Sequence, residues 1–354
     1  MKIQKKIFKV VSVLLLVLLV MPSQNAFAGN EDRAGQAGAG ELLIMPFPRS
    51  SGWGMSNTST VKGLEGMFLN VAGTAFTKST EIMFARTEWL KGSDVNINAF
   101  GLTQKVGETG VIGLSVMSMS FGEIQITTVD LPEGGIGTFR PSFLNIGMSY
   151  AKAFSNSIYG GIVIRIVSEA IADVRAQGIS IDAGIQYLTG DNENIHFGIA
   201  LRNIGPPMSF SGDGLSFTAS AVSSDISHTV EERSARYELP ALLNIGAAYD
   251  FLINDQHTLT LAGSFTSNSF YKDIYAAGLE YNFKNYFMLR GGFNYEKGMF
   301  DKATSTTAYT GPTAGVTIQV PMNKEKGSMF SIDYSYRTTD PFQGTHCIGA
   351  RIAL

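Results

Sequence analysis

The stretch Leu243 to Phe251 reads LNIGAAYDF, and its side chains alternate in character one by one. Leu, Ile, Ala, Tyr and Phe fall on one face, while Asn, Gly, Ala and Asp fall on the other. Successive side chains of a β-strand point to opposite faces, so a period of two predicts a strand. Tyr275 to Phe283 repeats the pattern. Strands with an apolar face opposite a small or polar face suit a wall between lipid and a lumen.

Runs of this kind recur along most of the chain after Thr80, and about fourteen are counted, an even number as bacterial outer-membrane barrels require. The sequence therefore predicts an all-β fold, a transmembrane antiparallel β-barrel. The expected strands are 81–90, 93–105, 109–121, 142–154, 157–169, 177–188, 193–203, 240–251, 257–267, 273–283, 286–296, 312–320, 327–337 and 345–354.

When the connections between the expected strands are numbered in order, the even-numbered ones are short and the odd-numbered ones are mostly long. With the start of the barrel assigned to the periplasm, the even-numbered connections are tight, such as SN after the fourth strand and KN after the tenth. The odd-numbered ones are mostly longer, notably Gly122 to Pro141 and Ile204 to Leu239, with the first a short exception. Short periplasmic turns and long external loops are typical of membrane barrels, whereas a soluble β-sandwich has no reason to sort its loops this way.

A Gly-x-x-Tyr pattern also recurs on the expected strands. An offset of three places the glycine and the tyrosine on opposite faces. Four of the five copies lie on descending strands, where their tyrosines would form an aromatic girdle near the periplasmic boundary. The alternative is that both residues are simply common in strands. The copies end at Tyr150, Tyr187, Tyr249, Tyr281 and Tyr295.

The first 28 residues have the pattern of a cleaved export signal. Four lysines precede the apolar run Val10 to Met21, and Ala26-Phe27-Ala28 supplies a cleavage site. Removing those lysines leaves 23 basic against 30 acidic residues, a formal charge of -7. A mildly acidic exported chain is not expected to bind nucleic acid. The predicted division is therefore a signal peptide (1–28), an N-terminal hatch segment (29–80) and an outer-membrane barrel (81–354) of a Gram-negative bacterium.

Motifs for catalysis, metals and cofactors were sought and not found. The four histidines are far apart, and the sequence has no H-E-x-x-H motif, Cys/His cluster or G-x-S-x-G elbow. The glycines of SGWGMS (Ser51–Ser56) lack the Gly-Lys-Ser/Thr of a phosphate loop and the preceding strand of a dinucleotide site. No enzyme activity, no metal and no cofactor is therefore predicted.

Seven charged side chains are expected to point into the lumen. They would either line a polar path for a ligand, or pair with each other and with a plug inside the barrel. Arg165 and Asp182 lie at similar distances from the loop that their strands share, which favours a cross-strand pair. The seven are Arg165, Asp182, Arg202, Glu280, Arg290, Asp333 and Arg351.

The hatch segment carries a family resemblance. Its stretches ELLI (Glu41–Ile44), RSSGWGM (Arg49–Met55) and GMFLNVAG (Gly66–Gly73) resemble the N-terminal pattern of the PorV/PorQ family, which is related to the FadL-type barrels. Val71 replaces the proline of the family's N-P-A-G turn, and Trp53 widens its glycine spacing. The residues of the hatch motif are Arg49, Ser50, Gly52, Gly54, Asn70, Ala72 and Gly73.

The resemblance implies a fourteen-stranded outer-membrane barrel and, for the best-known members, a role in type IX secretion in Bacteroidetes. The expected partners are outer-membrane lipid around the barrel, and translocon or attachment subunits and secreted cargo. The protein partners would be bound mainly by the two long external loops. The alternative is a FadL-like passive channel for hydrophobic or small solutes, with the hatch segment as a movable plug. A third reading is a structural barrel that only organises its neighbours.

Overall fold

The computed structural model describes Gly29 and residues 31–220, 227–323 and 327–354. The predicted signal peptide, residues 1–28, lies outside this range. Within the described residues, no helix combines the length and the apolar character that a membrane span needs.

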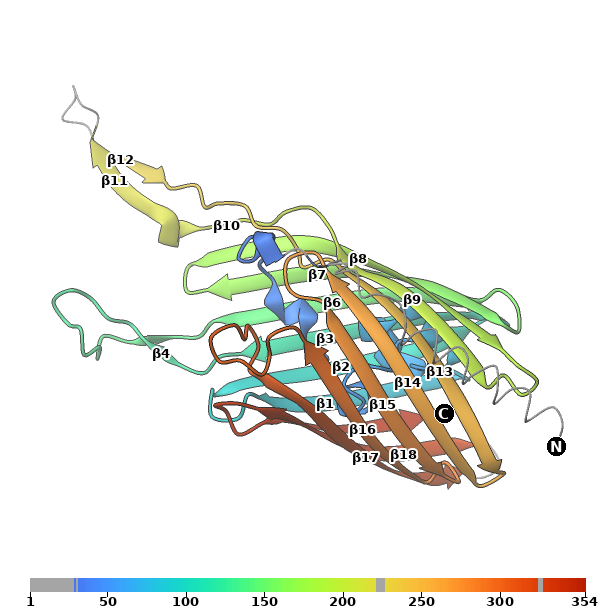
Figure 1. Ribbon diagram of the computed structural model, residues 1–354. Helices are drawn as coiled ribbons and strands as arrows, with labels where there is room; N and C mark the ends of the chain where they lie inside the picture. The colour runs from blue at the N-terminus through green and yellow to red at the C-terminus, as the bar shows by residue number, and fades with distance from the viewer. Residues whose placement is uncertain (1–28, 30, 221–226, 324–326) are drawn as a thin grey trace.

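Fourteen long strands form a closed antiparallel ring (Figure 1). Each strand pairs with the next one along the ring, and β1 closes it by pairing with β19, from Glu81 opposite Ala353 to Glu88 opposite His346. A closed ring leaves no unpaired edge in lipid. The predicted barrel is therefore confirmed, with its N-terminal segment inside. The strands are β1 Thr80–Trp89, β2 Val95–Val106, β3 Gly110–Ser120, β6 Ser142–Ala153, β7 Ile158–Ile171, β8 Val174–Thr189, β9 Ile195–Ile204, β13 Leu242–Asn254, β14 His257–Asn268, β15 Ile274–Phe283, β16 Phe287–Glu296, β17 Tyr309–Asn323, β18 Ser328–Thr339 and β19 Thr345–Ala353.

The outer face of the ring is apolar and the inner face is small or polar. In β13, Ile245 and Tyr249 are exposed on the outside, whereas Asn244 and Gly246 are buried inside. This is the alternation of the opening stretch, and it gives the barrel a surface suited to hydrocarbon. The tyrosines of the Gly-x-x-Tyr copies on β6, β8 and β13 lie outside, toward the strand ends that meet at the periplasmic turns.

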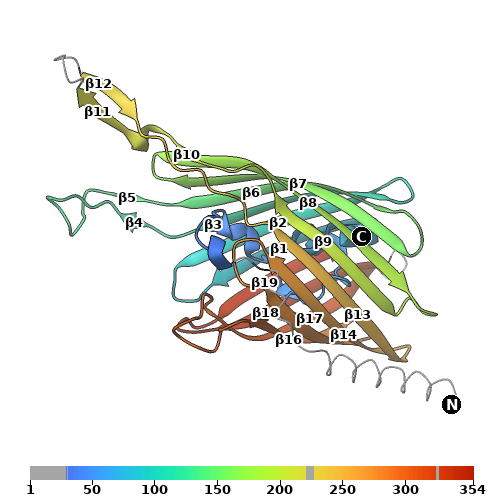
Figure 2. The same ribbon diagram turned by 45° about the horizontal axis from the view of Figure 1, so that its top comes forward.

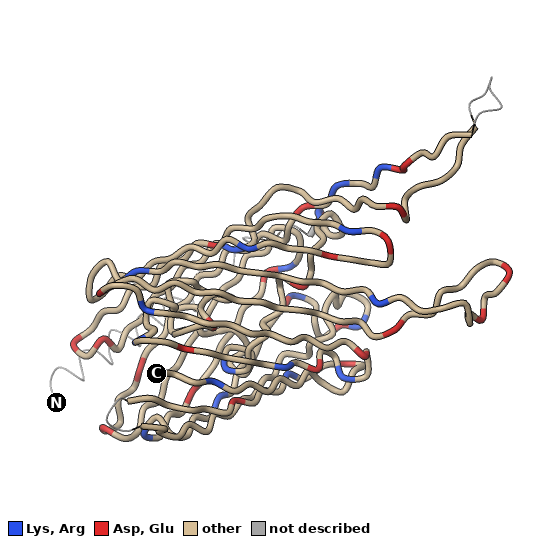
Figure 3. The backbone as a smooth tube through the Cα atoms, turned by 180° about the vertical axis from the view of Figure 1, so that it is seen from behind, with Lys and Arg blue, Asp and Glu red and all other residues tan. Residues whose placement is uncertain are grey.

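Two hairpins project beyond the barrel on the external side (Figure 2). One lies in the β3–β6 connection and holds β4 (Ile124–Gln125) and β5 (Thr138–Phe139). The other lies in the β9–β13 connection and holds β11 (Ser216–Ser220) and β12 (Ser227–Glu231). The same connection contains β10 (Phe210–Ser211), which pairs with β8, and the short helix η5 (Asp213–Leu215). Charged positions are frequent along both projections (Figure 3).

One external connection is much shorter than the parity pattern suggests. Only Ala172 and Asp173 join β7 to β8, so this pair continues outward as a strand ladder. The strand expected to begin at 177 begins at Val174 for this reason.

The hatch segment runs through the lumen (Figures 1 and 2). Phe47, Leu64 and Met67 pack with Met83 and Ile97 of the wall in the main apolar core. The interior of this barrel is thus filled by its own N-terminal residues. The hatch contains η1 (Glu31–Arg33), η2 (Gly40–Leu43), α2 (Pro48–Gly52), η3 (Gly63–Glu65), α3 (Gly66–Leu69) and η4 (Val71–Phe76).

Candidate functional site

The hatch segment crosses the lumen from the external mouth to the periplasmic floor. At the mouth, the Gly38 amide donates to the Glu238 carbonyl in the β9–β13 connection, at 3.0 Å. Near the floor, the Asn70 side-chain amide donates to the Ile185 carbonyl, close to the periplasmic end of β8, at 3.1 Å. The chain then leaves the lumen and begins β1. Any solute crossing the barrel must therefore pass this segment.

Arg49 and Ser50 of the hatch motif fix α2 in the lumen. Arg49 Nε donates to Asp333 of β18 at 2.7 Å, and Asp333 has no exposed surface. Ser50 Oγ donates to Glu65 Oε2 at 2.6 Å, and the Ser50 amide donates to the same oxygen at 2.8 Å. Glu65 thereby satisfies the amide end of α2, a short helix that has no side-chain cap from its preceding residue.

The remaining motif residues shape the backbone of the hatch. Gly54 has a left-handed φ of 64°, which favours glycine. The Asn70 amide also donates to the Thr58 carbonyl at 3.0 Å, while its oxygen accepts from the Ala72 amide at 3.2 Å. The expected turn is present, because the Gly73 amide donates to the Asn70 carbonyl at 2.9 Å. Ala72 is fully buried.

A row of inward glycines lets the hatch backbone approach the wall. A Cβ atom added at Gly292 would lie 2.5 Å from the Trp53 carbonyl carbon, and one added at Gly246 would lie 2.9 Å from Thr58 Cβ. Both distances are too short for a real Cβ atom, so a larger residue would displace the hatch. The glycine row consists of Gly184, Gly198, Gly246, Gly278, Gly292 and Gly315, from β8, β9, β13, β15, β16 and β17.

Four of these glycines, Gly184, Gly246, Gly278 and Gly292, belong to the Gly-x-x-Tyr copies, but the pattern did not predict their contact with the hatch. A usable signal was present, because glycine is costly inside a strand unless another backbone comes close. Its recurrence at inward positions of neighbouring strands marks a contact surface for a second segment.

Three of the seven lumen charges lie on β8 and its neighbours. Arg165 and Asp182 form the expected cross-strand pair at 3.3 Å, and Arg165 also donates to the Met67 carbonyl at 2.9 Å. Arg202 donates to the Leu42 carbonyl at 3.2 Å. These side chains therefore hold hatch backbone, as the plug alternative describes.

The other four lumen charges lie on β15 to β19. Arg290 pairs with Glu280 across β15 and β16. Arg351 lies 3.7 Å from Asp333, 3.8 Å from the hatch residue Glu65 and 3.7 Å from Glu81 of β1. Glu65 was not predicted, because the path of the hatch through the lumen leaves no periodic pattern in its sequence. Glu81, at the start of β1, was not predicted either.

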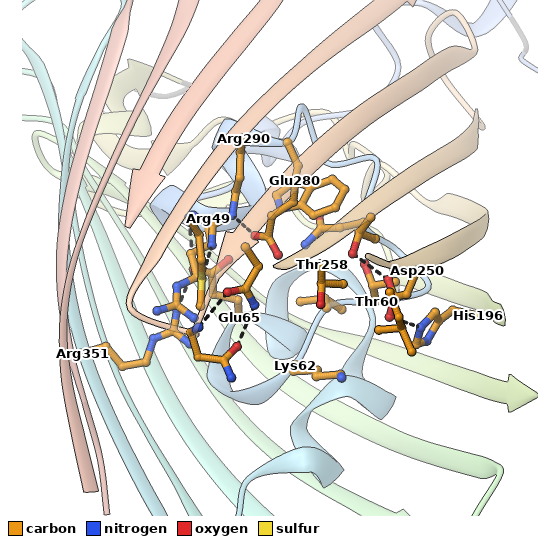
Figure 4. Close-up of a pocket in the computed structure, with 18 residues that line it drawn as sticks. Arg49, Thr60, Lys62, Glu65, His196, Asp250, Thr258, Glu280, Arg290 and Arg351 are labelled. Atoms are coloured by element: carbon orange, nitrogen blue, oxygen red, sulfur yellow. Dashed lines mark hydrogen bonds and ion pairs between the residues drawn. The ribbon is translucent and has the colours of Figure 1, made fainter. Parts of the chain in front are cut away.

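A polar cavity of about 380 Å³, the periplasmic cavity, lies in the periplasmic half of the lumen. Arg49, Arg290 and Arg351 gather on one side with Glu65 and Glu280 (Figure 4). On the opposite side His196 Nε2 lies 2.9 Å from Asp250 Oδ2 (Figure 4). Among the residues described, no group of three or more His, Cys, Asp or Glu side chains is arranged to hold a metal ion.

A second cavity of about 450 Å³, the external cavity, lies beside the hatch, whose residues Gly40, Leu43 and Met55 form part of its wall. Phe121 and Phe143 meet edge to face in its wall, with ring centroids 4.8 Å apart. Arg337 lies over the Tyr309 ring at 3.7 Å and is only 7% exposed, and no described residue forms an ion pair with it. The apolar part of the remaining wall includes Leu43, Ile44, Trp89, Met119 and Ile274, and its charged part consists of Glu41, Lys272 and Glu296.

One short piece of the hatch borders both cavities. Met55 lines the external cavity, while Trp53 and Asn57 line the periplasmic cavity. Gly54 and Met55 both have left-handed backbones, with φ of 64° and 61°. Residues 53–57 thus reach both cavities.

Comparison with known proteins bears on the fold. No family model matches the sequence, and no curated protein matches it. The structure resembles the CymD monoaromatic hydrocarbon channel, at a TM-score of 0.52 and 15% identity over 88% of this chain and 97% of that one. It also resembles the Ralstonia pickettii toluene transporter TbuX, at 0.53 and 13% identity over 88% and 98%. A Pseudomonas aeruginosa FadL homologue matches at 0.50 and 10% identity over 87% and 97%.

At identities of 10–15%, the likeness to these proteins shows the fold of this chain. The likeness does not extend to the PorV/PorQ identity suggested by the hatch motif. With its closed ring, apolar exterior and internal N-terminal segment, the chain has the fold of the FadL and toluene-transporter barrels of the Gram-negative outer membrane.

Proposed function

We propose that this protein is a passive outer-membrane channel for hydrophobic solutes, with the external cavity as the entry site and the hatch as its gate. The observation that carries the proposal is the external cavity itself. Ligand sites are concave and mostly apolar, with a few placed polar groups. Aromatic rings, aliphatic side chains and the unpaired Arg337 supply this combination.

Similarity to hydrocarbon channels supports the same proposal at the level of fold. CymD and TbuX are named for monoaromatic hydrocarbons and toluene. For this chain, an apolar molecule would enter the external cavity from outside. Movement of residues 53–57 would then connect the external cavity to the periplasmic cavity.

The test fills the external cavity and measures binding and uptake. Gly40 lines this cavity, and a Cβ added there meets no atom within 4 Å. We expect Gly40→Trp to abolish naphthalene binding and its uptake into proteoliposomes, while Gly40→Ala retains both. Uptake by Gly40→Trp at the wild-type rate would exclude the external cavity as the entry site. Absence of flux in both the wild-type protein and a variant that lacks residues 29–76 would exclude the channel.

A second function, partner binding in type IX secretion, is also proposed on one observation. The β4–β5 hairpin stands clear of the barrel and exposes apolar side chains, with Val129 at 99% and Leu131 at 53%. Exposed apolar groups at such a tip suit contact with translocon or attachment subunits, or with cargo. Lipid remains the partner of the barrel exterior.

Shortening the hairpin tests this second function. A variant with residues 126–136 replaced by a short turn should lose translocon or attachment subunits in a mild-detergent pull-down, while Gly40→Trp keeps them. Unchanged surface delivery of secreted cargo after gene deletion would exclude the secretion role.

A further inference from the structure

Four oxygen-bearing side chains meet where the hatch enters the barrel. Glu41 comes from η2 of the hatch, Asn145 from β6, Glu169 from β7 and Tyr237 from the β9–β13 connection. Glu41 and Asn145 are each 3% exposed, and Glu169 is 5% exposed. We call these residues the mouth cluster.

Three of the six side-chain oxygens of the mouth cluster have no hydrogen bond, and the side chains of Glu169 and Asn145 act on Glu41 at close range. Both carboxylate oxygens of Glu41 and the side-chain oxygen of Asn145 are buried without a partner. Tyr237 donates its hydroxyl hydrogen to Glu169 Oε2. An unpaired buried acceptor costs about 1–3 kcal/mol, and more where it is charged. Three such atoms in one place need a common partner.

The charge of the cluster is also uncompensated. The charged group that acts on Glu41 is Glu169, which has the same sign. Nearby arginines are engaged elsewhere: Arg165 with Asp182, Arg202 with the Leu42 carbonyl and Arg33 with Glu238. Burial, and then the proximity of Glu169, raise the pKa of Glu41 to about 8. Two buried carboxyl groups that act on each other must share a proton or bind a cation.

The available atoms indicate the class of cation. Carboxylate and amide oxygens are the ligands of Ca²⁺ and Mg²⁺, and Ca²⁺ accepts irregular sets completed by water. The cluster offers no histidine or cysteine to a softer metal. Tyr237 keeps its proton at neutral pH, because burial and its bond to Glu169 raise its pKa.

We propose that Glu41, Glu169 and the Asn145 oxygen bind a divalent cation of the calcium class, which fastens the start of the hatch to the barrel wall. The neighbouring backbone supports this role. The Gly38 amide donates to the Glu238 carbonyl at 3.0 Å, and the Glu238 amide donates to the Gln36 carbonyl at 3.1 Å. The ion therefore joins the hatch, the wall and the largest external connection at one point.

The experiment measures calcium binding to the full-length protein, stripped with EDTA and reconstituted in vesicles of zwitterionic phospholipid. Calorimetric titration with CaCl₂ at pH 7.5 should give one site per chain. Glu41→Gln, which keeps the side-chain shape, should weaken that site at least tenfold, and the exposed hairpin variant Glu133→Gln should not. Hydrogen exchange of residues 36–43 should slow with Ca²⁺ in the wild type and not in Glu41→Gln.

Two results would overturn the proposal. The first is that the wild type shows no saturable binding at millimolar Ca²⁺ and that its hydrogen exchange responds to pH alone. This result would mean that Glu41 and Glu169 only share a proton. The other is equal binding by the wild type and by Glu41→Gln. If Glu41→Gln fails to fold, Glu169→Gln serves as the second variant. Loss of calcium binding in Glu169→Gln would support the proposal, and unchanged binding would overturn it.

Discussion

Replacing Gly292 by alanine should loosen the hatch without weakening the barrel. The added Cβ would lie 2.5 Å from the Trp53 carbonyl carbon, whereas real Cβ contacts remain above 3.0 Å. The hatch backbone must therefore retreat by at least 0.5 Å, and it cannot swing aside as a side chain would. Overpacking of this kind typically costs about 1–3 kcal/mol.

Gly291 supplies a matched control on the same strand. A Cβ added there has its nearest contact at 4.0 Å, with the Thr313 carbonyl oxygen. Both variants gain the same backbone restriction from alanine, so the difference between them isolates the hatch contact. That difference corresponds to an increase of about 5- to 150-fold in local hatch opening.

The measurement is hydrogen exchange of peptides covering residues 51–59 in the reconstituted protein. Gly292→Ala should accelerate exchange there by the stated factor and leave the barrel strands unchanged. Equal exchange in Gly292→Ala and Gly291→Ala would refute the close approach of hatch and wall. Faster exchange across β15 to β17 would refute the claim that the hatch alone absorbs the change.

Three further predictions concern charged groups. Arg49→Met leaves Asp333 buried beside a more distant arginine and should destabilise hatch docking by about 3–5 kcal/mol in thermal unfolding, and adding Asp333→Leu should recover part of the loss. Arg337→Met should weaken 1-naphthoate binding about tenfold or more and leave naphthalene unaffected in a competition assay, whereas equal losses would remove Arg337 from the entry site. The pKa of Glu41 in the folded protein is about 8, above its ordinary value of 4.5. In EDTA, the contribution of Glu41 to hatch stability is therefore complete below pH 4.5 and falls as the pH rises toward 8. Melting curves at pH 5 and 9 should differ in the wild type and coincide in Glu41→Gln.

The barrel could be predicted because its signal is local and repeated. Apolar and polar side chains alternate from Leu243 to Phe251 because the strand separates lipid from lumen, and all the remaining strands obey the same constraint. The Arg165–Asp182 pair followed from the same register argument. The extension of β7 and β8 was not foreseen, because a two-residue external hairpin does not follow the parity pattern.

The site could be predicted only in part, because it depends on how the hatch lies against distant strands. Gln186 donates to the Thr58 and Val61 carbonyls, but nothing around Gln186 in the sequence indicates a backbone within reach. That no described residue forms an ion pair with Arg337 depends on where the fold places the carboxylates. Such facts arise from three-dimensional packing and are not written in any local pattern.

The path of the hatch also sets an order of assembly. Arg49 and Asp333 are 284 residues apart, and Thr313 reaches the Gly52 carbonyl across 261 residues. The earliest segment of the barrel chain to be synthesised thus finds its partners on strands made near the end, and contacts of such high sequence separation form slowly. In a nascent barrel that lacks β17 and β18, α2 has no partners for these contacts. Docking of the hatch and sealing of β1 against β19 are therefore expected to be a single late event, so a docked hatch reports a finished barrel.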